Sequence, residues 1–280
     1  MPERITHFTR DSLVFDVRDE GPISGTPVVL LHGFPQDSRS WDAVVPALHT
    51  AGFRTLAPDQ RGYSPGARPR RRRDYRGEEL AADVAALIAA VDAGPVHLVG
   101  HDWGAAAGWQ VAAGYPDLIR TLTAVSVPHP AAMVRAIRTS RQAFRSWYML
   151  AFQVPWIPEL LLTKPALTRS ILERMGQTPQ RAARDQSNLA HRTAARGAVH
   201  WYRGLPFTDR HTTSRAVRVP TLLVWSDRDK AIGPEGPELT ERYVRAPYRL
   251  VTLPGVSHWI PDEAPEELAE LILDHASTPG

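Results

Sequence analysis

The residue best suited to covalent chemistry is Asp102, at the centre of a Gly100-x-Asp102-x-Gly104 turn. A buried strand is predicted just before this turn and a helix of small residues just after it. This is the nucleophile-elbow pattern, with Asp where Ser is more common. Glycines permit the strained turn and the close helix–strand packing that the elbow needs. An Asp here could instead be the N-cap of the helix, so the turn alone leaves both roles open.

Aspartate in place of serine changes which substrates an elbow nucleophile can process. A serine that attacked an alkyl carbon would form an ether, which water does not readily cleave. An aspartate that attacks the same carbon forms an ester, which water can hydrolyse at the carbonyl. Aspartate also needs no activating base, because its ordinary pKa of about 3.9 leaves it ionised at neutral pH. Asp102 therefore indicates substrates with an electrophilic sp³ carbon, such as epoxides or alkyl halides.

Candidates for a general base and its orienting acid follow later predicted strands. His258 lies between a predicted strand and the last predicted helix, and is the best candidate base among eleven histidines. Asp227 and Asp229 both follow a strand, and either could orient His258. The order nucleophile, acid, base is the one expected for an elbow fold. There is no His/Asp cluster with metal-ligand spacing, and we expect neither a metal nor a cofactor.

Alternating strand and helix patterns must position these residues. Such alternation implies a parallel sheet with right-handed crossovers. Short continuous apolar runs are typical of strands buried on both faces. Strands are predicted at 13–17, 28–31, 53–57, 96–99, 122–125, 221–225 and 248–253, and helices at 41–48, 78–91, 105–113 and 263–275.

The alternation stops between about residues 128 and 205. This stretch has helical periodicity, many Arg and Trp residues and no convincing strand. A helical insertion between two sheet strands is typical of a cap over an active site. We therefore predict a core domain formed by 1–127 and 206–280, with a helical cap domain at 128–205.

Composition favours a soluble cytoplasmic protein whose partner is a small molecule. Hydrophobic residues make up 43% and charged residues 22%, enough for a sizeable core. The absence of Cys excludes disulfides and thiol catalysis. The basic patch at 68–73 stands alone in a Pro/Gly-rich loop without interleaved aromatics, which favours a solvated loop over nucleic-acid or membrane binding. Residues 1–10 have no apolar signal core, and no 18-residue apolar run follows.

Motifs along the whole chain resemble those of the α/β-hydrolase epoxide hydrolases and the related haloalkane dehalogenases. The resemblance implies an α/β-hydrolase fold, with a mostly parallel eight-stranded sheet flanked by helices. It implies an oxyanion hole made by the backbone N–H groups of Phe34 and Trp103, a Phe34-Pro35 bond that can be cis, and Asp229 rather than Asp227 as the orienting acid. The motifs are His32-Gly33-Phe34-Pro35, Asp59-Gln60-Arg61-Gly62-Tyr63-Ser64, Gly100-His101-Asp102-Trp103-Gly104 and Gly255-Val256-Ser257-His258.

Epoxide hydrolases are known for two cap tyrosines whose hydroxyls hold the epoxide oxygen. The matching segments, 146–153 and 200–203, place these tyrosines at Tyr148 and Tyr202. Ring opening creates a basic alkoxide, which a hydroxyl with a pKa near 10 can stabilise or protonate. Each tyrosine taken singly could instead be a packing aromatic.

A dehalogenase would bind a halide instead, usually with the indole N–H that follows the nucleophile and a second donor. Trp103 meets the first need in either family. Trp147, Trp156 or Trp201 could be the second donor, although Phe34 occupies the position where many dehalogenases have Asn. Fluoroacetate-type dehalogenases favour Arg at the position after the nucleophile, so Trp103 argues against that class.

We therefore predict an enzyme acting on ether bonds, which converts an apolar or aromatic epoxide into a vicinal diol through an ester on Asp102. The alternatives are a haloalkane dehalogenase or another α/β-hydrolase with the same nucleophile and, less favoured, a ligand-binding protein on this fold. A homodimer is compatible with the sequence. Substrate contacts are expected from His32, Pro35, Trp147, Phe152 and Trp259.

Overall fold

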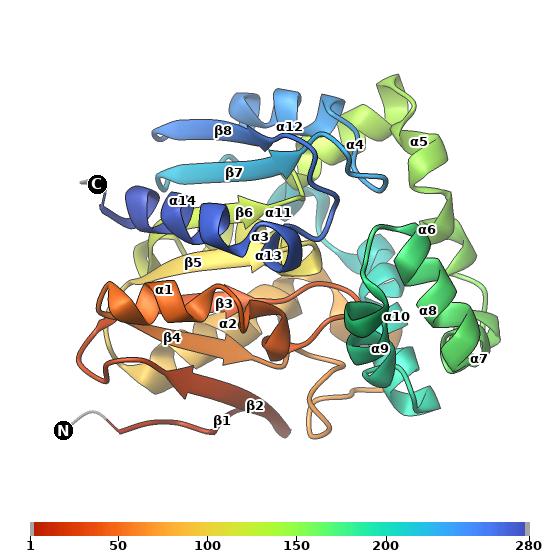
Figure 1. The fold of residues 1–280 in the computed structure, drawn as a ribbon, viewed down its shortest axis with the longest axis horizontal. Helices are drawn as coiled ribbons and strands as arrows, with labels where there is room; N and C mark the ends of the chain where they lie inside the picture. The colour runs from red at the N-terminus through yellow and green to blue at the C-terminus, as the bar shows by residue number, and fades with distance from the viewer. Residues whose placement is uncertain (1–2, 278–280) are drawn as a thin grey trace.

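Eight strands form one twisted sheet with helices on both faces in the computed structural model, which describes residues 3–277 (Figure 1). The strand order is β1-β2-β4-β3-β5-β6-β7-β8. β3 to β8 run parallel, and β1 and β2 form an antiparallel edge. The predicted mostly parallel eight-stranded sheet is confirmed. The strands are β1 His7–Arg10, β2 Leu13–Glu20, β3 Thr26–Leu31, β4 Phe53–Pro58, β5 Val96–His101, β6 Ile119–Val125, β7 Thr221–Ser226 and β8 Tyr248–Leu253.

The core has two layers because successive side chains of a strand point to opposite faces of the sheet. In β3, Val29 and Leu31 belong to one buried cluster, and Val28 and Leu30 belong to another. Helices α2 and α3 complete the first cluster, and α1 and α14 complete the second. These helices and their neighbours are η1 Ser38–Trp41, α1 Val45–Thr50, η2 Arg72–Tyr75, α2 Gly77–Val91, α3 Trp103–Gly114, η3 Pro116–Leu118, α12 Glu235–Thr240, η5 Glu241–Tyr243, α13 Ile260–Glu263 and α14 Pro265–Ser277.

A run of helices connects β6 to β7. It lies beyond the carboxyl ends of the parallel strands, on the right of Figure 1. The run begins within two residues of the predicted cap boundary and continues past residue 205 into α11. Its members are α4 Pro130–Thr139, α5 Gln142–Arg145, α6 Trp147–Ala151, α7 Ile157–Leu162, α8 Pro165–Arg174, α9 Pro179–Ser187, α10 Arg192–Gly204, η4 Leu205–Phe207 and α11 Arg210–Ser214.

Two elements differ from the predictions. The helix expected at 41–48 is divided into η1 and α1, because Pro46 occupies the first turn of α1, where a proline starts a helix rather than continuing one. The edge strand β1 was not among the predicted strands. It has only four residues, of which Phe8 alone is buried, so it carries no readable alternation.

The basic patch at 68–73, predicted to be a solvated loop, is only partly exposed. Arg70, Arg71 and Arg73 are exposed, but Arg68 donates hydrogen bonds to the carbonyls of Gly62 and Tyr63 and so helps to fix its own loop. Within residues 3–277, no helix combines the length and apolar character needed to cross a bilayer.

Candidate active site

Asp102 occupies a sharp turn between the end of β5 and the start of α3. Its φ of 51° and ψ of −119° are strained for a non-glycine residue. A Cβ on Gly33 would lie 2.4 Å from the Cβ of Asp102, and one on Gly104 would lie 2.2 Å from the carbonyl oxygen of Leu31. Neither position has room for a side chain. The strand–turn–helix geometry is therefore the one that the sequence predicts for a nucleophile elbow.

The Asp102 carboxylate points away from the helix that it precedes. It makes no capping hydrogen bond to α3, which removes the N-cap interpretation. Instead, the backbone N–H of Phe34 donates to Asp102 Oδ1 at 2.8 Å, and the Phe34-Pro35 peptide is cis. Trp103 is the first residue of α3, where backbone N–H groups lack intrahelical partners. These two N–H groups are the predicted oxyanion donors.

His258 lies between two carboxylates. Its Nε2 is 3.4 Å from Asp102 Oδ2, and its Nδ1 is 2.7 Å from Asp229 Oδ2. The other oxygen of Asp229 accepts from the backbone N–H groups of Ala231 and Ile232, at 2.7 and 2.8 Å, which fixes the carboxylate. Asp227 is exposed and accepts from the N–H of Gly255 instead. Of the two acids left open by the sequence, the structure places Asp229 beside His258.

The charges of His258, Asp102 and Asp229 shift the pKa values of His258 and Asp102. Burial by itself would lower the pKa of His258, but Asp229 and Asp102 outweigh burial and raise the pKa of His258 to about 10. Burial would raise the pKa of Asp102, and His258 reverses that effect, so the pKa of Asp102 lies below its ordinary value. The resting site therefore holds an ionised Asp102 beside a protonated His258.

A cavity of about 740 Å³ opens in front of Asp102. Tyr148 and Tyr202 line it together with Asp102 and Trp103. The two tyrosine rings lie with centroids 5.9 Å apart, and Tyr202 packs edge-on against Trp103 at 4.9 Å. Burial, assisted by the charge of Asp102, raises the pKa of both tyrosines. Both are therefore protonated at neutral pH and able to donate. The structure brings the five predicted catalytic residues to one place.

The expected substrate contacts are placed differently. Phe152 packs against the rings of Tyr202 and Phe34, at 4.8 and 5.6 Å, and so supports the tyrosines. The Trp147 side chain is 66% exposed, because α6 turns it outward. Neither residue is among those that line the cavity in the described part of the chain. The contacts of Trp147 and Phe152 with a substrate therefore stay predictions.

The remaining three residues expected to contact substrate are buried and have partners within the protein. His32 is fully buried and links the oxyanion loop to the next loop, with its Nε2 accepting from the N–H of Gln60 at 3.1 Å. Pro35 is buried, and its carbonyl accepts from the Asn188 amide. Trp259 is buried and donates to the carbonyl of Met175. The structure gives His32, Pro35 and Trp259 supporting contacts, and none of them lines the cavity described above.

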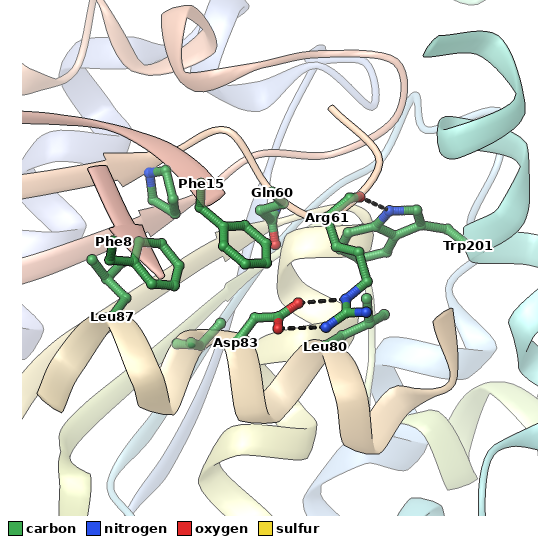
Figure 2. Close-up of a pocket in the computed structure, with 10 residues that line it drawn as sticks. Phe8, Phe15, Gln60, Arg61, Leu80, Asp83, Leu87 and Trp201 are labelled. Atoms are coloured by element: carbon green, nitrogen blue, oxygen red, sulfur yellow. Dashed lines mark hydrogen bonds and ion pairs between the residues drawn. The ribbon is translucent and has the colours of Figure 1, made fainter. Parts of the chain in front are cut away.

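The indole N–H groups considered as second halide donors are engaged or turned away. Trp201 lines the cavity, but its Nε1 donates to the carbonyl of Arg61 at 2.6 Å, as Figure 2 shows. The guanidinium of Arg61 is itself held by Asp83, so this carbonyl is part of a fixed buried junction. Trp147 and Trp156 are 66% and 74% exposed. None of these three indoles presents a free N–H beside Asp102.

A buried chain of polar contacts, absent from the predictions, links the helical run to the backbone of His258. His101 Nε2 donates to the carbonyl of His258 at 2.9 Å, and Nδ1 lies 3.0 Å from Gln36 Oε1. The Gln36 amide donates to Asp262, which also pairs with Arg184 of α9. Only His101 carries a sequence signal, its position next to the nucleophile; the other partners are scattered along the chain.

Within residues 3–277 there is no group of three or more His, Asp or Glu side chains placed to hold a metal ion.

Comparison with known proteins assigns this chain to a protein family. The sequence pattern of the α/β hydrolase fold family matches residues 26–265. The chain belongs to this family. Epoxide hydrolase 3 of Xenopus tropicalis is 32% identical over 259 residues, which cover 88% of this chain and 70% of that protein. Epoxide hydrolase A of Mycobacterium tuberculosis is 31% identical over 293 residues, covering 89% and 90%.

Solved structures agree with this α/β-hydrolase assignment. One, described as a novel epoxide hydrolase of the α/β-hydrolase superfamily from metagenomes of hot environments, superimposes with a TM-score of 0.85. It is 25% identical, and the match covers 100% of both chains. The predicted α/β-hydrolase fold and the predicted resemblance to epoxide hydrolases are confirmed.

Proposed function

We propose that this α/β-hydrolase is an epoxide hydrolase, an enzyme acting on ether bonds that converts an apolar epoxide into a vicinal diol. The observation that carries the proposal is the presence of Tyr148 and Tyr202 on the wall of the cavity that holds Asp102. Two neutral hydroxyls in the same cavity as a carboxylate suit an epoxide, whose oxygen becomes an alkoxide as the ring opens. Relatives named as epoxide hydrolases support the same conclusion.

The first half-reaction forms an ester. Asp102 Oδ2 attacks an epoxide carbon, while Oδ1 stays bound to the Phe34 N–H. The C–O bond of the epoxide breaks, and its electron pair becomes an alkoxide that takes a proton from Tyr148 or Tyr202. The proton on His258 then replaces the one that the tyrosine gave. This transfer is favoured because esterification removes the charge of Asp102, one of the two charges that raise the pKa of His258.

The second half-reaction restores the carboxylate. Neutral His258, oriented by Asp229, removes a proton from water, and the hydroxide attacks the carbonyl carbon of Asp102. The backbone N–H groups of Phe34 and Trp103 stabilise the oxyanion. The ester bond breaks, the diol leaves with the original Oδ2, and His258 is again protonated beside an ionised Asp102. Protons and charge balance over the cycle.

Residues 128–205 serve as the cap in this proposal. The cavity walls come from both parts of the chain, with Asp102 and Ala106 from the core and Met133, Tyr148 and Tyr202 from the helical run. A substrate must therefore pass between the core and the helices that carry the two hydroxyl donors. The polar chain through Arg184 and Asp262 holds α9 against the core.

A single turnover in H₂¹⁸O tests the ester intermediate. With enzyme in excess over epoxide, the heavy oxygen should enter Asp102 and not the diol, because the diol keeps the original Oδ2. Mass spectrometry of the diol and of the peptide that contains Asp102 would show this. Heavy oxygen in the diol of the first turnover, with Asp102 unlabelled, would mean direct attack by water and would contradict the proposal.

Stability should depend on pH through His258. Its folded-state pKa of about 10 lies above the ordinary value of 6.5, so its charge stabilises the fold fully below pH 6.5. This contribution should be lost as the pH rises from 6.5 to about 10, with a slope of at most about 1.4 kcal/mol per pH unit. Chemical denaturation at several pH values measures the slope. The His258→Gln variant should lack this component, and an equal slope in both proteins would count against the assigned charge state.

A further inference from the structure

Helix α5 of the helical run holds the loop that carries Asp229. Gln142, the first residue of α5, donates from Nε2 to the carbonyl of Ala231 at 2.8 Å. Its Oε1 accepts from the backbone N–H of Gly233, also at 2.8 Å. Arg145, the last residue of α5, donates to the carbonyl of Asp229 at 2.9 Å. Three hydrogen bonds therefore join a helix between β6 and β7 to the loop that follows β7.

The amide of Gln142 is buried, and most of its hydrogen bonds are made to this loop. Gln142 is 1% exposed, and its Nε2 makes one further hydrogen bond, to Ser146 Oγ at 3.0 Å. A buried amide that lost its partners would destabilise the fold, because water could not replace them. The loop and the helix are therefore held in one relative position, since each would leave the other with unsatisfied polar groups.

The peptide group between Ala231 and Ile232 links Gln142 to the Asp229 carboxylate. In a trans peptide such as this one, the C=O and the N–H point in opposite directions. The C=O accepts from Gln142, and the N–H donates to Asp229 Oδ1 at 2.8 Å. The other carboxylate oxygen, Oδ2, contacts His258 Nδ1 at 2.7 Å. Gln142 therefore orients one of the two N–H groups that hold this carboxylate beside His258.

We propose that Gln142 is a positioning residue for the second half-reaction. It holds the loop of Asp229 so that the carboxylate stays in contact with His258 while water attacks the ester. This inference rests on the proposed epoxide hydrolase function and gives the helical run a part in ester hydrolysis as well as in ring opening. The hydrogen bonds of the Gln142 amide do not involve Asp102. Formation of the ester should therefore not depend on Gln142.

The Gln142→Met variant tests the proposal, because methionine keeps the length of the side chain and loses its hydrogen bonds. Rapid-quench mass spectrometry of a single turnover measures ester formation and ester hydrolysis separately. Formation should keep its wild-type rate, and hydrolysis should slow by about tenfold, the effect of one lost hydrogen bond. Equal slowing of both steps, or no slowing of hydrolysis, overturns the proposal.

A second buried amide provides the matched control. Gln177 also belongs to the helical run and is 5% exposed, but it donates to Asp185 and not to the loop that follows β7. Gln177→Met should therefore share a loss of thermal stability with Gln142→Met and still hydrolyse the ester at the wild-type rate. Equally slow hydrolysis in the two variants would reflect a general loosening of the helical run and would overturn the proposal.

A double variant decides whether Gln142 acts through Asp229. Asp229→Ala removes the carboxylate that the peptide group holds, so there is nothing left for Gln142 to position. Adding Gln142→Met to Asp229→Ala should therefore leave the already slow hydrolysis unchanged. A further tenfold loss, on the order of that expected in the single variant, would show that Gln142 acts by another route and would overturn the proposal.

The contact between Asp229 and His258 can also be measured without a substrate. The proton that His258 Nδ1 donates to Asp229 gives a low-field NMR signal, and its rate of exchange with water reports how well the contact is kept. Exchange should be faster in Gln142→Met and unchanged in Gln177→Met. If the wild type opens no epoxide, the proposed function fails, and this measurement still decides the inference, because wild-type exchange in Gln142→Met overturns it.

Discussion

The His258→Gln variant is expected to stop after the first half-reaction and to accumulate a covalent ester on Asp102. Glutamine cannot remove a proton from the attacking water, whereas Asp102, the Phe34 N–H and both tyrosines remain in place. Steady-state diol formation should fall by about 10²–10⁴-fold, the usual contribution of a general base. Intact-protein mass spectrometry should show a gain equal to the mass of one epoxide. Normal turnover by this variant would remove His258 as the base.

A matched pair of acid variants serves as the control for this result. Asp229 contacts His258 Nδ1 at 2.7 Å, whereas Asp227 accepts from the backbone of Gly255. Asp229→Asn should therefore slow hydrolysis of the ester, and Asp227→Asn should leave it unchanged. The opposite order of effects would mean that the contact between Asp229 and His258 has no part in the reaction.

The Tyr148→Phe, Tyr202→Phe double variant is expected to lose epoxide opening itself. Without either hydroxyl, the alkoxide would form unprotonated inside an apolar cavity, and the rate should fall by about 10²–10⁴-fold. Because this block precedes the ester, adding both substitutions to His258→Gln should abolish the mass gain expected for His258→Gln alone. That result assigns the tyrosines to the first step and His258 to the second.

A third tyrosine provides the control. Tyr75 also lines the cavity, but its hydroxyl donates to the carbonyl of Pro69 at 3.1 Å and has no role in the proposed reaction. Tyr75→Phe should keep epoxide opening. Full activity on epoxides in the Tyr148→Phe, Tyr202→Phe double variant would instead show that the oxygen is held by other groups, and a halide-release assay would then be the next measurement.

Sequence alone predicts the parts of this protein that depend on neighbours along the chain. The elbow is one, because its glycines, strand and helix are contiguous, and the sheet is another, because alternating apolar runs specify strands and crossovers. The place of His258 before the last helix also predicts its role as the base. The substitution of Asp for Ser then predicts attack on an alkyl carbon, because water can hydrolyse the resulting ester.

Tertiary structure decides the features that depend on which distant groups meet. Asp227 and Asp229 are two residues apart and follow the same strand, so only the folded loop shows which one contacts His258. From the sequence, Trp201 is a candidate for a free indole donor. In the folded protein its N–H donates to the carbonyl of Arg61.

The expected substrate contacts stay predictions for the same physical reason. Local sequence gives the type of a side chain but not the direction in which packing turns it. Trp147 and Tyr148 are adjacent on α6, yet the tryptophan is 66% exposed and the tyrosine lines the cavity. The sequence thus predicts the nucleophile and its chemistry. The packing of the helical run over the sheet decides what surrounds Asp102, because that packing depends on contacts between residues far apart in the chain.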